Sequence, residues 1–219
     1  MHFLSFYDKI ELSKGGFKKD MFKTILAATT NQGKVKEIKE ILSGFEVISL
    51  KEAGIDVDVE ENGETFLENA YIKASEIARL SDLPVLADDS GLEIKALGGR
   101  PGVYSARYAG EDAPYSEKVK KLTEELKDIA PDERLAQFSC AVCLILPDGR
   151  RIEATGVSCP GILLDSPRGE NGFGYDPYFY SINHKKTFSE MSLEEKNEVS
   201  HRKAALVALL NKIKGELNI

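Results

Sequence analysis

The sequence is poor in cysteine and has no long apolar run, and both absences restrict what the protein can be. It contains three cysteines in 219 residues, too few for the disulfide framework that stabilises small secreted domains. Although 42% of the residues are hydrophobic, no apolar stretch approaches the roughly 18 to 20 residues of a membrane span. The longest stretch, residues 141–146, is typical of a buried strand. We therefore expect a globular protein of the reducing cytoplasm with no membrane partner.

The chain also lacks an excess of positive charge. Its 29 Lys and Arg residues are outnumbered by 36 Asp and Glu residues, which gives a formal net charge of −7. Proteins that bind nucleic acid through its phosphates usually present a basic face. We therefore predict no nucleic-acid partner. A polyphosphate ligand would have to be met by locally concentrated Lys and Arg, or by a metal cation.

No internal repeat, low-complexity tract or linker divides the sequence. Residues 1–20 mix aromatic side chains with Lys and Gly without a period, and they lack the apolar segment and cleavage site of a secretory signal. Met21 directly precedes the first well-patterned segment. We expect residues 1–20 to be an N-terminal extension outside the core and residues 21–219 to form a single domain. Whether synthesis starts at Met1 or Met21 stays open.

Apolar periodicity predicts an α/β fold. Residues 23–28 are typical of a strand, residues 29–33 of a polar turn, and residues 34–43 carry apolar side chains at helical spacing. A second strand at 45–50 completes a strand–loop–helix–strand order, which is typical of α/β proteins. The later pattern predicts a helix opened by a capping box at 65–68, a strand at 84–87, a helix containing Val119, Leu122, Leu126 and Ile129, a hairpin of strands at 138–146 and 151–157, and one long helix from Ser192 to about Lys214.

The turn at residues 29–34 is the first candidate binding site. It joins a strand to a helix, so free backbone N–H groups gather at the positive end of that helix. Gly33 permits close approach of a ligand, and Lys34 adds a positive charge. The segment has neither the GxxxxGKS/T spacing of a P-loop nor the GxGxxG of a dinucleotide-binding fold. An anion site and an ordinary solvated turn are both compatible with it.

Asp88 and Asp89 are the first candidates for catalysis. They directly follow the apolar run 84–87, at the kind of strand end where ligands of open α/β sheets gather. Because successive strand residues face opposite ways, we expect one of the two acids to point into the site. The alternative is a plain Asp turn in which Gly91 takes an unusual backbone angle.

Glu60 and Glu61 form a second acidic segment, just before the helix that begins near residue 65. They either complement the dipole of that helix or complete a metal site with Asp89. Oxygen ligands of this kind suit Mg²⁺ or Mn²⁺ rather than zinc.

The segment from Gly172 to Pro177 contains an aromatic ring suited to a base. Glycines flank Phe173, and a ring stacked on a base contributes about 1–3 kcal/mol in nucleic-acid systems. Asp176 is suited to reading the edge of that base. A turn with core aromatics is the alternative.

Several further residues carry weaker signals. His201 and Arg202 follow each other in the predicted last helix with Lys196 upstream, and neighbouring helical residues point about 100° apart. None of the three alone indicates a site. Cys140 and Cys143 form a CxxC inside a predicted strand, where this spacing turns the thiols to opposite faces and favours a core role.

Taken together, these segments resemble the inosine/xanthosine triphosphate pyrophosphatase family, which removes noncanonical purine nucleotides. Each motif alone is weak, but seven occur in order at the family's spacing, from about Lys23 to the last helix. The matching segments are residues 28–34, 60–66, 68–70 with Lys73, 87–92, 97–110, 173–177 and 200–202.

The resemblance implies a role for each matching residue. Asp89 would be the catalytic acid–base residue and a metal ligand, and Lys73 a second catalytic residue facing the phosphates. Glu60 would be the other metal-site carboxylate, with Glu61 as the alternative. Thr30 stands where the family more often has Gly, so details of the phosphate loop stay open. The substrate-binding residues would be Thr29, Thr30, Asn31, Gln32, Gly33 and Lys34 for the triphosphate, with Ser90, Phe173, Gly174, Tyr175, Asp176, Lys196, His201 and Arg202 for the rest of the nucleotide.

The resemblance also implies an architecture and an activity. The family fold is an elongated α/β structure in which a mixed twisted sheet, flanked by helices, joins two lobes around a nucleotide cleft, commonly in a homodimer. The activity would be metal-dependent hydrolysis of ITP, dITP and XTP to the monophosphate and pyrophosphate, with Mg²⁺ or alternatively Mn²⁺. Two hypotheses compete with it: a related hydrolase of dTTP or UTP, and a nucleotide-binding regulator without turnover. The purine-type segments 173–177 and 200–202 argue against the first, and the paired acids argue against the second.

Overall fold

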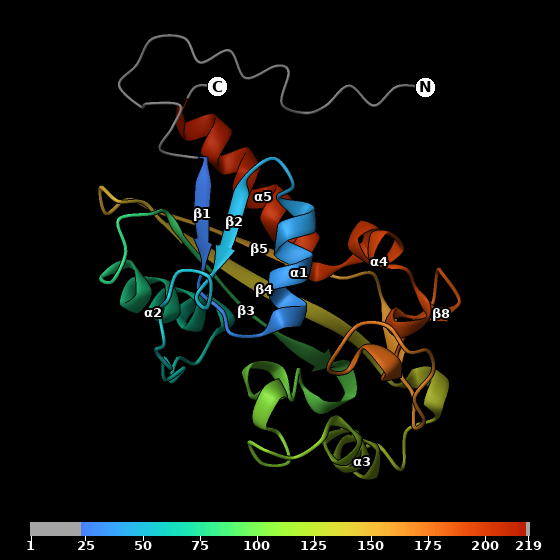
Figure 1. Cartoon of the computed structure of the whole chain (residues 1–219). Coiled ribbons are helices and arrows are strands. Elements are labelled where there is room, and N and C mark those ends of the chain that lie inside the picture. Colours follow the sequence, from blue (N-terminus) through green and yellow to red (C-terminus); the bar gives the residue numbers. More distant parts are fainter. Residues whose placement is uncertain (1–22, 218–219) are drawn as a thin grey trace, which may run out of the picture.

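A mixed eight-stranded sheet forms the centre of the protein (Figure 1). The computed structural model describes residues 23–217, so the predicted extension 1–20 and Met21 lie outside the described residues. The strands lie in the order β2-β1-β3-β4-β6-β7-β8, and β5 also pairs with β4. The strands are β1 Thr24–Ala27, β2 Glu46–Ser49, β3 Val85–Ile94, β4 Leu135–Ile145, β5 Arg151–Val157, β6 Gly161–Leu163, β7 Phe179–Ser181 and β8 Lys186–Thr187.

The sheet is parallel at one end and antiparallel at the other. β1 pairs in parallel with β2 and β3, whereas the pairings from β3 onward are antiparallel. The predicted α/β class, with a mixed sheet flanked by helices, is confirmed. The α-helices are α1 Gln32–Ile41, α2 Phe66–Ala78, α3 Tyr115–Glu125, α4 Leu193–Val199 and α5 His201–Leu217, and the 3₁₀ helices are η2 Lys95–Leu97, η3 Gly102–Arg107, η4 Pro131–Glu133, η5 Asp176–Tyr178 and η6 Phe188–Glu190.

The apolar side chains form separate cores at the two ends of the long strands β3 and β4. At one end, α1 and α5 cover one face of the sheet and α2 covers the other. At the other end, Leu92 of β3 and Phe138 of β4 pack with α3, β6 and β7. The two long strands therefore join two packed halves, and the predicted site residues of β3 lie between them.

Strand β3 is longer than predicted. The sequence predicted a strand at 84–87 that ends before Asp88, and this boundary is wrong, because β4 pairs with β3 continuously to Ile94. The pairing of β3 with β1 stops at Leu86. The two acids therefore project past the carboxyl end of β1, beside the turn that precedes α1. They lie near the predicted place although their own strand does not end there.

The predicted single last helix is two helices. α4 ends at Val199 and α5 begins at His201, with Ser200 between them in an extended conformation (φ −84°, ψ 149°). The hydroxyl oxygen of Ser200 accepts a hydrogen bond from the N–H of Lys203 at 3.2 Å, as the N-cap residue of a new helix does. Arg202 therefore lies in the first turn of α5, and its predicted position near the middle of one long helix is wrong.

Other local predictions are confirmed. Thr65 and Glu68 form the capping box of α2, and β4 and β5 form the expected antiparallel hairpin. Cys140 and Cys143 are free thiols buried in different core clusters, on opposite faces of the sheet. Within residues 23–217, no helix is both long enough and apolar enough to cross a membrane.

Candidate active site

The turn between β1 and α1 is held in shape by its own side chains. The hydroxyl oxygen of Thr29 accepts a hydrogen bond from the N–H of Asn31 at 3.2 Å, and Asn31 Oδ1 accepts one from the N–H of Lys34 at 3.1 Å. Asn31 is the N-cap of α1, so the helix begins at Gln32 and not at Lys34 as predicted. The N–H groups of Gln32 and Gly33 have no partner within the helix, which is the arrangement that binds anions.

Behind this turn, basic and acidic side chains from α1, β3, η5, α4 and α5 meet in a largely buried group, which we call the ion cluster. Three members are basic and three are acidic, so their formal charges cancel. The ion cluster consists of Lys34, Lys196, Arg202, Glu37, Asp88 and Asp176.

Arg202 is the centre of the ion cluster. Its Nη2 atom lies 2.9 Å from Asp88 and donates to the hydroxyl of Ser90 at 3.0 Å, while Nη1 pairs with Glu37. Lys34 Nζ lies 3.2 Å from the same oxygen of Asp88. Because Arg202 and Lys34 share Asp88, the start of α1 is tied to the start of α5.

Lys196 joins the other two acids of the ion cluster. Its Nζ atom lies 2.6 Å from Glu37 and 2.5 Å from Asp176. The same carboxylate oxygen of Asp176 that pairs with Lys196, Oδ2, also accepts a hydrogen bond from the N–H of Phe173 at 2.8 Å. Burial raises the pKa of Asp176, although Lys196 opposes that rise. The segment predicted to hold the base is thus anchored to α4 and α1.

The other two acids of the ion cluster are held in the ionised form. Burial alone would raise the pKa of Asp88, but Lys34 and Arg202 outweigh it and hold the pKa well below its usual range. Arg202 and Lys196 lower the pKa of Glu37 in the same way. Glu37 was not predicted as a site residue. The available signal was its spacing, because it follows Lys34 by three positions and so shares a face of α1.

Asp89 faces the other side of β3 from the ion cluster. Its Oδ2 atom accepts a hydrogen bond from Asn69 Nδ2 at 3.0 Å, and its Oδ1 atom accepts one from the N–H of Ser90 at 2.8 Å. Burial, aided by the negative charge of Glu61, raises the pKa of Asp89 to about 6. The alternation expected for neighbouring strand residues therefore separates the two acids. Asp88 stays ionised because cations offset its charge, whereas Asp89 titrates near neutral pH.

Glu61, not Glu60, is the acid that the structure brings to Asp89. Glu61 Oε1 lies 2.7 Å from Lys73 Nζ, and the same ammonium donates to the backbone oxygen of Asp88 at 3.0 Å. Glu60 is exposed and makes no ion pair or hydrogen bond with any other described residue. Of the two alternatives that the sequence left open, Glu61 is the one whose side chain faces Lys73 and Asp89, because neighbouring residues of an extended segment point to opposite sides. A metal role for either acid stays a prediction.

A small hollow lies between the turn that joins β1 to α1 and the segment that carries Glu61. Thr29, Thr30, Asp58, Glu61 and Lys73 contribute its polar lining. Thr29 and Thr30 at the beginning of the turn and the pair of Glu61 and Lys73 therefore face one space. A larger cavity of about 460 Å³ lies between α2 and the turn that joins β4 to β5, and its lining contains none of the predicted site residues. The functional groups, and not the size of a cavity, identify the candidate site.

Phe173 lies between the ion cluster and the turn that joins β1 to α1. Its ring packs against Gly33, where a side-chain carbon would come within 2.5 Å of the ring. Lys196 Nζ lies 4.8 Å from the ring centroid and Arg202 Cζ lies 5.9 Å from it. The side chain of Phe173 stays partly exposed, so the ring can contact a ligand. Position 33 requires glycine because any side chain there would displace the ring.

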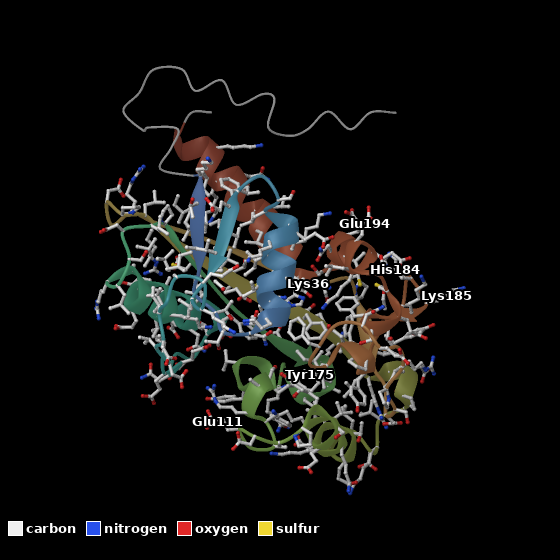
Figure 2. The ribbon with its side chains drawn as sticks, in the orientation of Figure 1. Lys36, Glu111, Tyr175, His184, Lys185 and Glu194 are labelled. Atoms are coloured by element: carbon white, nitrogen blue, oxygen red, sulfur yellow. The ribbon has the colours of Figure 1, made fainter. Side chains whose placement is uncertain are left out.

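Two further side chains predicted to bind substrate, those of Tyr175 and His201, are packed in the interior outside the ion cluster. Tyr175 lies beside η3 (Figure 2), and its hydroxyl donates to the backbone oxygen of Ser105 at 2.9 Å. His201 stacks on Phe138 with ring centroids 4.8 Å apart, and burial lowers its pKa so far that the ring is neutral. Gly174, with φ of 67°, forms the turn before the buried tyrosine. Tyr175 therefore supports the site from within the core and does not line it.

Comparison with known proteins identifies the family. A sequence model described as the Ham1 family matches residues 25–212. The chain belongs to the Ham1 family. The matched range includes both halves of the sheet and all the site residues described above.

Members of the Ham1 family resemble this chain over nearly their whole length. The dITP/XTP pyrophosphatase of Clostridium perfringens is 50% identical over 203 residues, which cover 89% of this chain and 99% of the relative. The dITP/XTP pyrophosphatase of Bacillus subtilis is 47% identical over 191 residues, or 86% and 96% of the two chains. The solved structure of the Staphylococcus aureus Ham1 protein has a TM-score of 0.76 at 42% identity, covering 89% of this chain and all of that one. The predicted family resemblance is therefore confirmed.

From the contacts of the ion cluster we predict that replacing Glu37 lowers the free energy of unfolding by an amount that depends on pH. Glu37→Gln leaves Lys196 and Arg202 without one buried negative charge, which should lower the free energy of unfolding by about 3–5 kcal/mol at neutral pH. Because the pKa of Glu37 is lowered in the folded protein, its stabilising effect is complete above its ordinary value of 4.5 and is lost as the pH falls further. Urea unfolding should therefore show a difference between variant and wild type that shrinks below about pH 4.5. A difference that does not change with pH would contradict the assignment.

Proposed function

We propose that this nucleoside triphosphate pyrophosphatase of the Ham1 family hydrolyses noncanonical purine nucleotides, such as ITP, dITP and XTP, to the monophosphate and pyrophosphate. Relatives at 50% and 47% identity bear the name dITP/XTP pyrophosphatase. The observation that carries the proposal is that the turn between β1 and α1, with Lys34, lies beside the acids of β3. Lys34 Nζ lies 3.2 Å from Asp88, and its positive charge is also close enough to Asp89 to lower the pKa of that carboxyl group against the effect of burial. A cation for the phosphates and a proton acceptor thus lie close together.

We also propose that Asp89 and Glu61 hold a divalent cation, either Mg²⁺ or Mn²⁺. The charge of Glu61 contributes to the raised pKa of Asp89, and a cation between the two would relieve that repulsion. No group of three His, Cys, Asp or Glu side chains suited to a metal occurs in the described part of the chain. Two carboxylates still fit Mg²⁺, which in phosphate-transfer sites takes its other oxygens from water and from the substrate. The bound cation would supply positive charge opposite the phosphates.

The protein's own residues divide the reaction between them. N–H groups at the start of α1, together with Lys34 and Lys73, bind the phosphate oxygens and stabilise the negative charge that grows on them. Asp89 is largely ionised at neutral pH because its pKa is about 6, and it accepts a proton from the attacking water. The water oxygen bonds to the α-phosphorus while the bond from that phosphorus to the bridging oxygen breaks. Pyrophosphate then leaves intact.

Arg202 is our candidate for selection of the base. Four of its five N–H groups are used by Asp88, Glu37 and Ser90, which leaves one. Because the side chain is only 1% exposed, a base would have to open the ion cluster to reach it. The O6 atom of an oxopurine accepts this hydrogen bond, whereas the 6-amino group of adenine would set a donor against a donor. A polar mismatch of this kind discriminates by large factors. Guanine also carries O6, so it must be rejected at its 2-amino group.

The family resemblance further leads us to propose that the enzyme acts as a homodimer in the cytoplasm. Sedimentation equilibrium of the full-length protein measures the oligomeric state directly. A monomer at micromolar concentration would remove the proposed dimer without affecting the proposed chemistry.

A substrate survey tests the proposed function. Purified full-length protein is incubated with ITP, XTP, dITP, ATP, GTP and dTTP, with and without Mg²⁺, and the products are separated by ion-exchange chromatography. We expect monophosphate and pyrophosphate from ITP, XTP and dITP in the presence of Mg²⁺, and far less product from the other nucleotides. Preference for dTTP would favour the competing hydrolase, and release of phosphate would contradict the proposed bond. Binding without turnover would identify a regulator.

Replacement of Asp89 tests the assigned proton acceptor. Asp89→Asn keeps the size of the side chain but removes its basicity, so kcat for dITP should fall by about 100-fold or more, with KM little changed. Asp148→Asn, in the turn between β4 and β5, is the matched control. In the wild type, kcat/KM should decline at acidic pH, because protonated Asp89 can neither accept a proton nor bind the cation. The bound cation should place this decline below the pKa of about 6 of the metal-free site. Normal turnover by the Asp89→Asn variant would show that the role is misassigned.

Phe173 should contribute mainly to binding. Phe173→Ala removes a stacking surface worth about 1–3 kcal/mol, so KM for dITP should rise by about 5- to 150-fold while kcat changes less. Phe173→Tyr preserves the flat ring and should behave like the wild type. Steady-state kinetics of the three proteins measure this, and an unchanged KM in the alanine variant would exclude stacking on the base.

A further inference from the structure

Asn69 is fully buried at the start of α2 and contacts both acidic parts of the site. Its Nδ2 atom donates to Asp89 Oδ2 at 3.0 Å. Its Oδ1 atom accepts the backbone N–H of Gly63 at 2.7 Å. Gly63 lies two residues after Glu61, so one amide group links the carboxylate of β3 to the loop that carries the second acid.

The two partners of Asn69 fix the orientation of its amide. The N–H of Gly63 can only donate, so it must face the oxygen of the amide. The ionised carboxylate of Asp89 can only accept, so it must face the NH₂ group. Rotation of the amide by 180° would set donor against donor at one end and acceptor against acceptor at the other. Asn69 therefore has a single arrangement that satisfies both neighbours, and burial makes any other arrangement costly.

The hydrogen bond from Asn69 also limits rotation of the Asp89 carboxylate. Oδ2 is held by the amide and Oδ1 by the N–H of Ser90 at 2.8 Å. Each carboxylate oxygen can accept a further hydrogen bond or a cation. The protein thus fixes the plane of the carboxylate and leaves accepting capacity on both oxygens.

The loop end of this link is equally constrained. A side-chain carbon on Gly63 would come within 2.8 Å of Asn69 Oδ1 and within 2.7 Å of Glu68 Cβ. Glycine at this position lets the loop approach the amide closely. The backbone oxygen of Glu61 is also within 3.4 Å of Arg107 Nη2, so the loop is held from two sides.

We propose that Asn69 is a positioning residue that holds the Asp89 carboxylate and the Glu61 loop in one fixed arrangement. This inference rests on the proposed function, because it assumes that Asp89 and Glu61 act together on the substrate. Asn69 acts through the Asp89 carboxylate and through the backbone of the loop at Gly63, which are its two partners. Its absence should therefore lower turnover more than substrate binding, and should loosen the loop independently of any reaction.

Substitutions can separate the two contacts of Asn69. Asn69→Asp keeps an oxygen for the N–H of Gly63 but replaces the donor to Asp89 by a second carboxylate oxygen. Asn69→Leu removes both contacts while keeping the branching pattern and the number of side-chain heavy atoms. Gly63→Ala keeps Asn69 but pushes on its amide from the loop. Ser75→Ala is the matched control, because the Ser75 hydroxyl donates to Ile72 within α2 itself.

Two measurements are made on each purified full-length variant. In the first, kcat for dITP should fall by about 10- to 100-fold in all three test variants, a range typical for residues that orient metal-site ligands, with KM little changed. In the second, hydrogen–deuterium exchange over residues 57–64 without nucleotide should rise in Asn69→Leu and Gly63→Ala but not in Asn69→Asp. Ser75→Ala should match the wild type in both measurements.

The outcomes distinguish this inference from the proposed function. Wild-type kcat in folded Asn69→Leu, or in Asn69→Asp, overturns the positioning role. Unchanged exchange of the loop in both Asn69→Leu and Gly63→Ala also overturns it. If Asn69→Leu does not fold, Asn69→Asp and Gly63→Ala decide the question. Normal turnover by Asp89→Asn contradicts the proposed function itself, whereas loss of turnover there with normal Asn69 variants contradicts this inference alone.

Discussion

The ion pairs of Arg202 with Asp88 and Glu37 are the interaction on which the rest of the site depends. Both acids are buried, and a buried carboxylate without a partner would cost several kcal/mol. Arg202 neutralises them together from the first turn of α5, and Lys34 and Lys196 complete the balance. Helices that are far apart in the sequence are therefore fixed against β3 by charge as well as by apolar packing. Because the guanidinium is planar and its donors are directed, the arrangement is also fixed in angle.

The alternation of side chains along β3 divides structure from chemistry within one dipeptide. Asp88 points into the ion cluster, where two cations keep its pKa low, and Asp89 points to the other face, where burial and Glu61 raise its pKa to about 6. The pKa values of two identical side chains on neighbouring residues are thus shifted in opposite directions. Lys73 lies across this division, because its ammonium contacts both the backbone oxygen of Asp88 and the carboxylate of Glu61. A substitution of Asp88 or of Glu61 would therefore change the surroundings of the Lys73 ammonium.

Much of the fold could be read from the sequence because its local signals agree with the tertiary structure. The capping box at Thr65 and the apolar run before Asp88 each predicted an element that the structure contains. The errors arose where tertiary contacts decide. β4 pairs with β3 through two acidic residues, which no local pattern favours. Ser200 ends one helix and caps the next inside a continuous helical pattern.

The site was harder to predict than the fold, for the same reason. Periodicity could not tell that Glu37 would be buried between two cations, nor that Tyr175 would turn into the core. The choice between Glu60 and Glu61 depends on which way an extended segment faces, and that is set by Lys73 and Asn69 in another element. The motifs drew attention to segments that the fold brings together, and the packing decides which of their side chains face one another.

The order of the ion cluster along the chain has a consequence for synthesis. Glu37 and Asp88 belong to the first half of the sequence, whereas Lys196 and Arg202 come from the last two helices. While the chain is still being made, the two carboxylates must stay in water, since nothing yet offsets their burial except Lys34. The interior between α1 and β3 can dry and close when α4 and α5 arrive. A chain released before that point would keep this region hydrated and open.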